Sequence, residues 1–336
     1  MIRRVSWVLL LGCPFAAHAD YEWELAGLFD HAERNAGSRR PTDEVDSDLL
    51  SLSATHYFNP VEEGSGPPAL AAFFDPRTQL SIAAGEEHTT DRSFGGPNSF
   101  FNSEGKEEVS DYSLRGLYLF PESKWYAGGR YARHEGERRT SSSSINPANV
   151  MGSGMSSSDV QDYALFAGKY FGTGATRLEL SLEQSTEETE ISSTSCNVFG
   201  SCSTFSFNGE TTFDTPTLAV MHVRRLRSAT YALLGEYSET QERFEGQIFD
   251  LPAIQTYFVG AELYPVPTVG VRLGYESFKS PAFDEETVSI GASWFFRRNV
   301  GLDLTLSRED ANDNNPFSDD DPRHTDRAAL RVIGRL

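Results

Sequence analysis

The sequence predicts an all-β protein, a transmembrane antiparallel up-and-down β-barrel of about 14 strands with short periplasmic turns and long extracellular loops. Three observations predict it: apolar and polar residues alternate with period two, short and long connections alternate along the chain, and aromatic residues cluster near strand ends. The 336 residues have a mean hydropathy of −0.42. After the N-terminal segment, no apolar run approaches the roughly 18 residues that a spanning helix needs, which excludes a helical membrane protein.

The alternation is cleanest late in the chain, where residues 300–307 place four aliphatic side chains on one face and Gly, Asp, Thr and Ser on the other. Because successive side chains of a strand point to opposite faces, this pattern predicts a strand between an apolar and a polar environment. By the same criterion, strands are expected over 21–30, 47–58, 69–85, 109–120, 124–135, 160–171, 174–186, 214–225, 229–240, 253–264, 267–278, 286–297, 299–308 and 325–336.

The connections between these strands differ in length in a regular order. Outer-membrane barrels have short turns on the periplasmic side and long loops outside, and this order is typical of a chain that starts and ends at the periplasm. The connection 59–68 is the exception, because it is longer than the other short turns. The short connections are 121–123, 172–173, 226–228, 265–266 and 298, a briefer external one is 279–285, and the long ones are 31–46, 86–108, 136–159, 187–213, 241–252 and 309–324.

Aromatic residues form two groups, one beside the short turns and one near the opposite strand ends. Amphipathic rings gather in this way at the two boundaries of a membrane, whereas the core of a soluble β-sandwich, the alternative fold, does not predict rings that follow the short turns. The first group is Tyr57, Phe58, Tyr118, Phe120, Trp125, Tyr126, Tyr170, Phe171, Tyr231, Tyr264 and Trp294–Phe296; the second is Phe29, Tyr112, Tyr131, Tyr163, Tyr237, Tyr257 and Tyr275.

The first 19 residues are expected to be a secretory signal peptide. Two arginines precede an apolar stretch, and a small-x-small cleavage site ends at Ala19, so that 20–336 form the mature barrel. A lipoprotein cleavage box ending at Cys13 is an alternative. Removing the signal peptide removes two basic residues and leaves 27 basic against 49 acidic ones, a charge of −22. This charge disfavours a nucleic-acid partner, which must be met by Lys and Arg.

The exported chain keeps two cysteines, Cys196 and Cys202, which are six residues apart. In an oxidising compartment such a pair most often forms a local disulfide. The alternative, a metal-binding pair, lacks neighbouring histidines. We therefore expect a disulfide in loop 187–213, and we expect no metal or other cofactor.

Two segments resemble a known family. The run Leu52–Val61 followed by Gly66–Phe74 is similar to the second strand, turn and third strand of bacterial outer-membrane porins, in particular of a gammaproteobacterial porin group. The last strand, with Ala328, Leu330, Val332, Gly334 and Leu336 on one face, is similar to the C-terminal signature that the barrel-insertion machinery reads, although Leu336 replaces the usual aromatic residue. The resemblance implies an outer-membrane protein in contact with lipid and lipopolysaccharide.

Charged residues in the expected strands indicate which face is wet. Arg or Lys on the lipid face near the bilayer midplane costs about 2–4 kcal/mol, so charged positions are expected to point into the lumen. An inward Lys169 places Tyr163 and Leu165 inward and Phe166 and Tyr170 toward lipid. The alternative is that Lys169, which is near a turn, extends its ammonium to the interface. The expected lumen residues are rich in arginine, which places most of the negative charge in the loops. They are Arg115, Arg130, Arg177, Glu179, Glu236, Glu262, Arg272, Glu276, Arg297, Asp303, Arg327, Arg331 and Arg335.

The hypothesis that follows is a water-filled pore for small hydrophilic solutes or ions, with a field shaped by these arginines and carboxylates. About 14 strands lie between the 8-stranded barrels that side chains fill and the 16-stranded ones that leave a channel. The opposing possibility is that the charges pair across a blocked lumen. A strand that begins near Asp20 leaves no N-terminal plug, whereas loop 136–159 or loop 187–213 could fold inward.

Other functions remain open at this stage. The acidic loops could bind divalent cations beside lipopolysaccharide, and Asp310, Asn312, Asn314 and Asp321 match the spacing of a calcium loop, although Asn315 stands where glycine is wanted. An outer-membrane hydrolase needs a nucleophile and a base within reach of each other. His134 with Glu135 and Glu137 is the best candidate, but no catalytic motif accompanies it, so we expect no enzyme. A surface receptor or adhesin that works through its loops is a further alternative.

Overall fold

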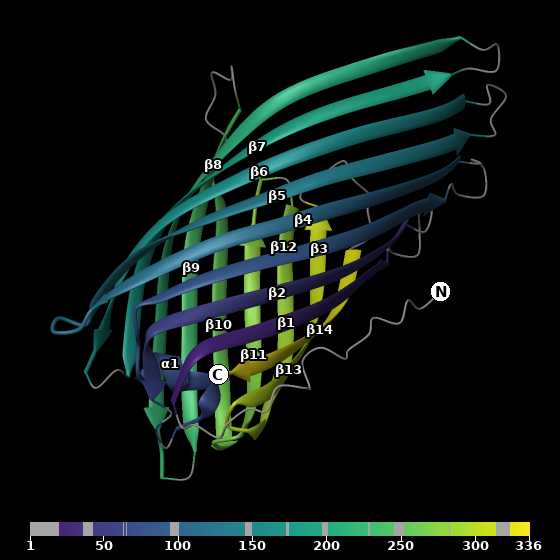
Figure 1. The fold of residues 1–336 in the computed structure, drawn as a ribbon. Helices are drawn as coiled ribbons and strands as arrows, with labels where there is room; N and C mark the ends of the chain where they lie inside the picture. Colours follow the sequence, from purple (N-terminus) through teal and green to yellow (C-terminus); the bar gives the residue numbers. More distant parts are fainter. Residues whose placement is uncertain are drawn as a thin grey trace.

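The computed structural model describes residues 20–35, 43–62, 64, 66–94, 101–144, 150–172, 175–196, 201–227, 229–244, 252–281, 283–313 and 323–336. The expected signal peptide lies outside these residues, as do Cys13, Asn314 and Asp321. Fourteen antiparallel strands close into one barrel, in which each strand pairs with its neighbours in sequence and β1 pairs with β14 (Figure 1). The expected fold class and strand number are therefore confirmed.

The connection between β2 and β3 contains a short helical segment, η2 followed by α1, and the other elements that the structure describes are strands. The elements in chain order are β1 (Asp20–Asn35), β2 (Asp43–Glu62), η2 (Pro68–Leu70), α1 (Ala71–Phe74), β3 (Gln79–Phe94), β4 (Phe101–Phe120), β5 (Trp125–Ser144), β6 (Val150–Phe171), β7 (Thr176–Cys196), β8 (Cys202–Arg225), β9 (Thr230–Phe244), β10 (Ile254–Val266), β11 (Val269–Lys279), β12 (Phe283–Arg297), β13 (Val300–Asp313) and β14 (Arg323–Arg335). Among the described residues, no helix has the length and apolarity of a membrane span.

The two ends of the described chain close the barrel together. The amides of Glu22 and Trp23 both donate to the carbonyl of Leu336, at 2.8 and 3.0 Å, and the amide of Leu336 donates back to Trp23 at 2.9 Å. This junction lies at the end that carries the short turns. We call it the periplasmic end, and the opposite end the extracellular end.

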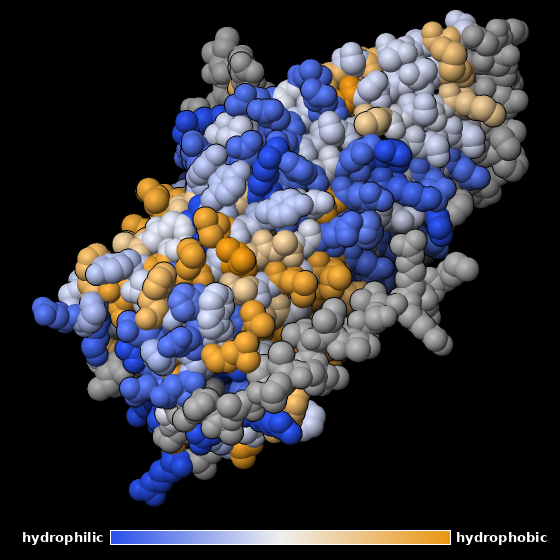
Figure 2. Space-filling model, viewed as in Figure 1, coloured by the Kyte–Doolittle hydropathy of each residue, from blue (hydrophilic) through white to orange (hydrophobic). Residues whose placement is uncertain are grey.

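An apolar belt surrounds the outer face next to the periplasmic end. Leu180, Val259 and Ile290 are between 52 and 57% exposed, although each lies inside a strand. Figure 2 shows the belt as a band of apolar side chains with hydrophilic surface beyond it. Exposed aliphatic residues on alternate positions around a closed sheet are what a barrel presents to lipid.

Several strands run farther toward the extracellular end than the alternation predicts. β3, β4, β5, β6, β7 and β8 take up most of the expected loops 86–108, 136–159 and 187–213, and β4–β8 form a long tilted sheet that continues past the ends of β9–β14 (Figure 1). Those loop assignments were wrong for a physical reason. Beyond the membrane both faces of a strand are wet, so apolar contrast disappears while the hydrogen-bonded ladders of neighbouring strands continue.

The expected third strand, 69–85, is also wrong in its first half. Residues 68–74 form η2 and α1, and β3 begins at Gln79. Gly66 and Pro67 precede the helical turn and Pro68 is its first residue, and proline both fixes φ and favours the first position of a helix. The long connection after β2 therefore has a structure of its own.

Candidate functional site

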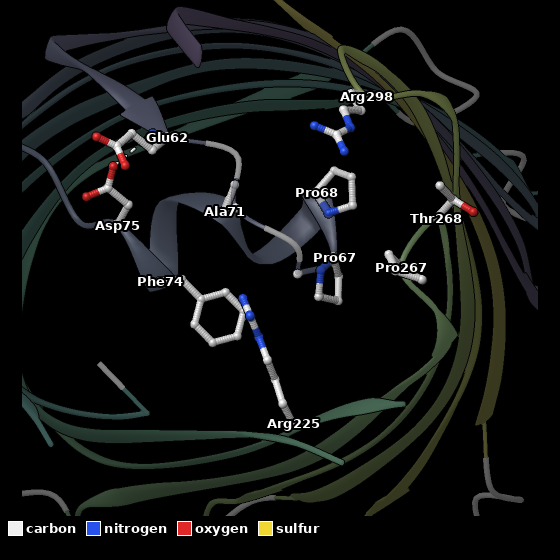
Figure 3. Close-up of a pocket in the computed structure, with 12 residues that line it drawn as sticks. Glu62, Pro67, Pro68, Ala71, Phe74, Asp75, Arg225, Pro267, Thr268 and Arg298 are labelled. Carbon is white, nitrogen blue, oxygen red and sulfur yellow. Dashed lines mark hydrogen bonds between the residues drawn. The ribbon is translucent and has the colours of Figure 1, made fainter. Parts of the chain in front are cut away.

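The connection between β2 and β3 folds into the periplasmic end of the barrel. We call residues 66–74 the plug, and Figure 3 shows it surrounded by strands. Leu70 and Phe73 of the plug are 5 and 7% exposed. They pack in one buried cluster with side chains that project inward from the barrel wall. The wall residues of this cluster are Leu117, Tyr126, Phe166, Tyr170, Val223, Ala232 and Tyr264.

The plug reaches two nearly opposite walls of the barrel. On β14, Arg335 donates from Nη1 to the carbonyl oxygen of Pro68 at 2.8 Å. On β6, the ring of Tyr170 lies 5.9 Å from that of Phe73, in an edge-on arrangement. Five strands separate β14 from β6 in one direction around the barrel and seven in the other. Among the loops that the structure describes, it is therefore this connection, and neither 136–159 nor 187–213, that obstructs the lumen.

Arg335 is the most buried arginine of this region, with 4% of its surface exposed. Its Nε donates to Glu24 Oε2 at 3.0 Å, and its guanidinium lies 4.6 Å from the ring centre of Tyr21 and 5.1 Å from that of Phe295. A charge-assisted hydrogen bond, a backbone hydrogen bond and two cation–π contacts thus satisfy a cation that has little water around it.

Further contacts hold the other side of the plug and the residue that follows it. The guanidinium of Arg225, from the end of β8, lies 4.5 Å from the ring centre of Phe74 (Figure 3). Asp75 accepts from the amide of Glu62 at 2.8 Å and from Arg77 Nη2 at 2.7 Å, which closes the base of the connection. A cavity of about 490 Å³ lies on the periplasmic side of the plug, between Phe74, Arg225 and Arg298.

Above the plug, one network joins three neighbouring strands. The hydroxyl of Tyr126 on β5 donates to Glu179 on β7 at 2.6 Å, passing over Gly168 of β6. A Cβ at Gly168 would lie 2.3 Å from that hydroxyl oxygen, so only glycine permits the contact. Arg177 is half-buried beside Tyr170 and Glu179.

Three more of the expected lumen arginines contact inward-facing partners. Their contacts are Arg115 over the ring of Phe166 at 4.7 Å, Arg130 Nη2 with Glu183 Oε2 at 2.7 Å, and Arg272 Nη2 with Asp303 Oδ1 and Thr305 Oγ1, both at 2.8 Å. A fourth, Arg331, lies 3.7 Å from Glu24. These pairs fix the charged side chains along the wall, and none of them crosses the lumen to the opposite wall.

The remaining expected residues lie on the inner face or at the periplasmic rim. Glu276 and Arg327 line a hollow of about 200 Å³ across β11–β14, together with Glu285 and Glu309. Glu236 and Glu262 alternate with outward-facing residues on β9 and β10. Arg297 is the exposed last residue of β12, after a register shift, and therefore lies at the periplasmic rim.

The expectation that the lumen is rich in arginine was wrong. Eight further carboxylates face inward, so the lumen holds both signs of charge. Five of them lie within the expected strands, where the period-two alternation already places them on the inner face. The other three, Glu87, Glu285 and Glu309, lie in parts of β3, β12 and β13 beyond the expected strand ends, where continued alternation would have found them. The eight carboxylates are Glu24, Asp30, Glu87, Asp111, Asp162, Glu183, Glu285 and Glu309.

The expected orientation of β6 was also wrong. Tyr163 and Leu165 are 53 and 73% exposed on the outer face, whereas Phe166 and Tyr170 are 7 and 6% exposed and face inward. Lys169 points outward and places its Nζ 5.2 Å from the ring centre of Trp125. A lysine this close to a turn extends its ammonium toward the interface, so its charge does not identify a lumen position.

His134 joins three strands at the extracellular mouth of the lumen. Its Nδ1 lies 2.5 Å from Asp111 on β4, and its Nε2 lies 3.0 Å from Asp162 on β6. It stands three residues beyond Tyr131, outside the apolar belt. Burial lowers its pKa, but the two carboxylates outweigh burial and raise the pKa of His134 above its ordinary value.

This geometry does not assemble the suggested hydrolytic site. Both ring nitrogens of His134 are occupied by carboxylates, while Glu135 contacts Arg133 and Glu137 contacts Arg139 on the outer face. No group of three or more metal-ligating side chains is found within the described ranges.

Cys196 and Cys202, the expected cysteine pair, form a disulfide at the tip of β7 and β8. Asp310, the first residue of the suggested calcium loop, places its Oδ1 2.5 Å from Nδ1 of His324.

Comparison with known proteins identifies the fold. No family model and no curated protein matches the chain. A Pseudomonas aeruginosa FadL homologue has a TM-score of 0.60 at 9% identity, covering 94% of this chain and 90% of that one. The Ralstonia pickettii toluene transporter TbuX has a TM-score of 0.57 at 11% identity, with coverages of 94 and 90%. The Pseudomonas putida toluene transporter TodX has a TM-score of 0.54 at 10% identity, with coverages of 95 and 90%.

At such identities these similarities establish the architecture only. The chain has the fold of the outer-membrane β-barrels, and the structures similar to it include proteins described as transporters.

Proposed function

We propose that the protein is an outer-membrane channel through which small hydrophilic solutes or ions diffuse, with the plug as its narrowest point. One observation carries the proposal. Over the same stretch of each strand, the outer face is aliphatic while the inner face holds paired charges such as Arg272–Asp303 and Arg130–Glu183. Charged pairs along one wall remain hydrated only beside water, and they shape the field that a passing ion meets.

This proposal includes a cellular setting. After signal cleavage at Ala19 the barrel would insert through the C-terminal signature of β14 and lie in the outer membrane. Its outward carboxylates beyond the belt, such as Asp48 and Glu86, would then face lipopolysaccharide and its divalent cations. The resemblance to porins supports this assignment. The proposed channel function requires neither a cofactor nor a catalytic site.

A second candidate is passage of apolar molecules. The toluene transporters among the structural neighbours suggest it, and the apolar cluster between the plug and the wall favours it, because Phe73, Phe166 and Tyr170 present ring faces inside the barrel. Liposome uptake assays with a sugar and with toluene separate the two. Uptake of the sugar supports the hydrophilic channel, whereas uptake of toluene alone would replace it.

Ion selectivity tests the hydrophilic channel directly. Replacing Arg177 and Arg272 by Glu reverses two positive charges on the inner face, so the reversal potential in a salt gradient should shift toward cation selectivity. The control is Arg243→Glu, because Arg243 contacts Asp214 on the outer face. An unchanged reversal potential in the double variant would remove Arg177 and Arg272 from the ion pathway.

A further inference from the structure

The extracellular part of β8 is the edge of a sheet. β8 pairs with β7 over its whole length, as far as Cys196 opposite Cys202. Its pairing with β9 begins only at Thr211 opposite Phe244. In the described chain, residues 203–210 therefore have a strand on one side only, and Figure 1 shows β8 along the upper edge of the long tilted sheet. A strand edge presents backbone donors and acceptors to any extended segment that approaches it.

The same segment carries an exposed apolar strip. Phe205 and Phe207 are 62 and 50% exposed, and because they are two residues apart they lie on the same face. Ile191 of β7 lies directly opposite Phe207 and is 38% exposed. These residues lie well beyond the apolar belt, so lipid does not explain them. They form a narrow row that one added strand would cover.

The edge lacks the features that normally prevent pairing. Exposed edges are usually protected by lysine, proline, a bulge or a short strand. Residues 203–210 contain no lysine, arginine or proline, and their register with β7 has no shift. The disulfide between Cys196 and Cys202 ties the two strands together at the tip. The edge is therefore long, regular and held in place before any partner arrives.

Carboxylates beside the edge determine what could bind it. Glu188 lies directly opposite Glu210, and Glu190 follows two residues along β7 on the same face. A second copy of this chain would bring the same carboxylates and a formal charge of −20 to the contact. Like charges disfavour that pairing, whereas Lys or Arg side chains on the incoming strand would neutralise the row.

We propose that residues 203–210 of β8 bind an extended cationic polypeptide segment, which adds to the sheet as one more strand. Its apolar side chains, at every second position, pack on Phe205, Phe207 and Ile191. Its Lys or Arg side chains, at the alternate positions, face Glu188, Glu190 and Glu210. Backbone hydrogen bonds provide affinity and the alternation provides specificity, as in other strand-addition complexes. This site is independent of the channel function.

The test uses the mature chain in lipid nanodiscs and a fluorescent nonapeptide of alternating Val and Lys. We expect the peptide to bind, with weaker binding at higher salt. Phe205→Ala with Phe207→Ala should weaken binding by at least about tenfold, because truncating buried aromatic anchors has such effects at interfaces. The control pair is Met151→Ala with Met155→Ala, since these residues are 69 and 51% exposed on the opposite face of the same sheet.

Two further measurements distinguish strand addition from non-specific adsorption of the cationic peptide. N-methylation of every second peptide amide blocks edge pairing in one of the two possible patterns, so only one of two methylated peptides should bind. Equal binding of both, or equal affinity of the phenylalanine and methionine variants, would overturn the proposal. A protein dimer in sedimentation that Phe207→Ala abolishes would identify a second copy as the occupant and would also overturn it.

Discussion

The side chain of Arg335 holds several parts of the periplasmic end together. It contacts Glu24 across the β1–β14 closure, the Pro68 carbonyl of the plug, and the rings of Tyr21 and Phe295. Sequence alternation could place Arg335 on the inner face, but it could not identify the plug carbonyl as a partner, because that contact joins residues 267 positions apart.

We predict that Arg335→Met destabilises the barrel by about 3 kcal/mol, because removing one partner of a buried ion pair leaves the other uncompensated. Arg331→Met is the matched control. Arg331 approaches the same carboxylate of Glu24 at 3.7 Å, but its side chain is 47% exposed, so the loss should stay below about 1 kcal/mol. Urea unfolding in lipid vesicles measures both values, and equal losses would contradict the account.

His134 should make stability depend on pH. Its folded-state pKa is raised, so its contribution is complete below the unfolded value of 6.5 and is lost as the pH rises through the folded value. The stability difference between the wild type and His134→Gln should therefore be larger at about pH 6 than at about pH 9. A difference that is independent of pH would show that the proton on His134 does not hold Asp111 and Asp162.

Adjacent residues of β7 test which face meets lipid. Leu180 is 56% exposed in the middle of the apolar belt, and Ser181 points the other way. Leu180→Arg should cost about 2–4 kcal/mol, the price of a midplane arginine on the lipid face, whereas Ser181→Arg in a wet lumen should cost less than about 1 kcal/mol. Urea unfolding in vesicles measures both, and the reverse order would mean that β7 is turned inside out.

At the level of the elements, strand number and barrel order follow from period-two alternation, and the plug does not. Alternation exists because each membrane-spanning strand separates lipid from the lumen, and the pattern is therefore visible from 300 to 307. The plug has no such periodicity. Its signals were the unusual length of connection 59–68 and the run Gly66-Pro67-Pro68, and neither indicates which way a connection folds.

The extracellular parts of the strands were not predicted, because apolar contrast ends where the membrane ends. β6 and β7 continue for many residues beyond the belt, where Ser, Thr, Gly and Glu alternate with one another and apolar contrast is absent. Their pairing is continuous from Phe171–Thr176 to Met151–Cys196. In this part the strands are held by backbone hydrogen bonds to their neighbours, and contact with lipid no longer determines their sequence pattern. Facing errors such as that at Lys169 occurred where a long side chain near a turn reached the interface.

Taken as a whole, the molecule is asymmetric along the barrel axis. The periplasmic end is narrowed by the plug and by aromatic side chains, whereas the extracellular end opens between a long sheet of β4–β8 and the shorter strands β9–β14 (Figure 1). A solute entering from outside would meet paired charges first and the plug last. In the proposed channel, the plug would therefore determine what passes, and the wall charges would influence which ions reach it.

The most direct test of the channel is planar-bilayer conductance of residues 20–336 beside a variant in which residues 63–77 are replaced by a short Gly-Ser turn. The account predicts discrete steps for the wild type, of low conductance because the plug narrows the lumen, and clearly larger steps for the variant. Heat-modifiable migration in gels confirms that both are folded. A folded variant that conducts no better than the wild type would contradict the role of the plug, and two folded barrels that never conduct would contradict the channel itself.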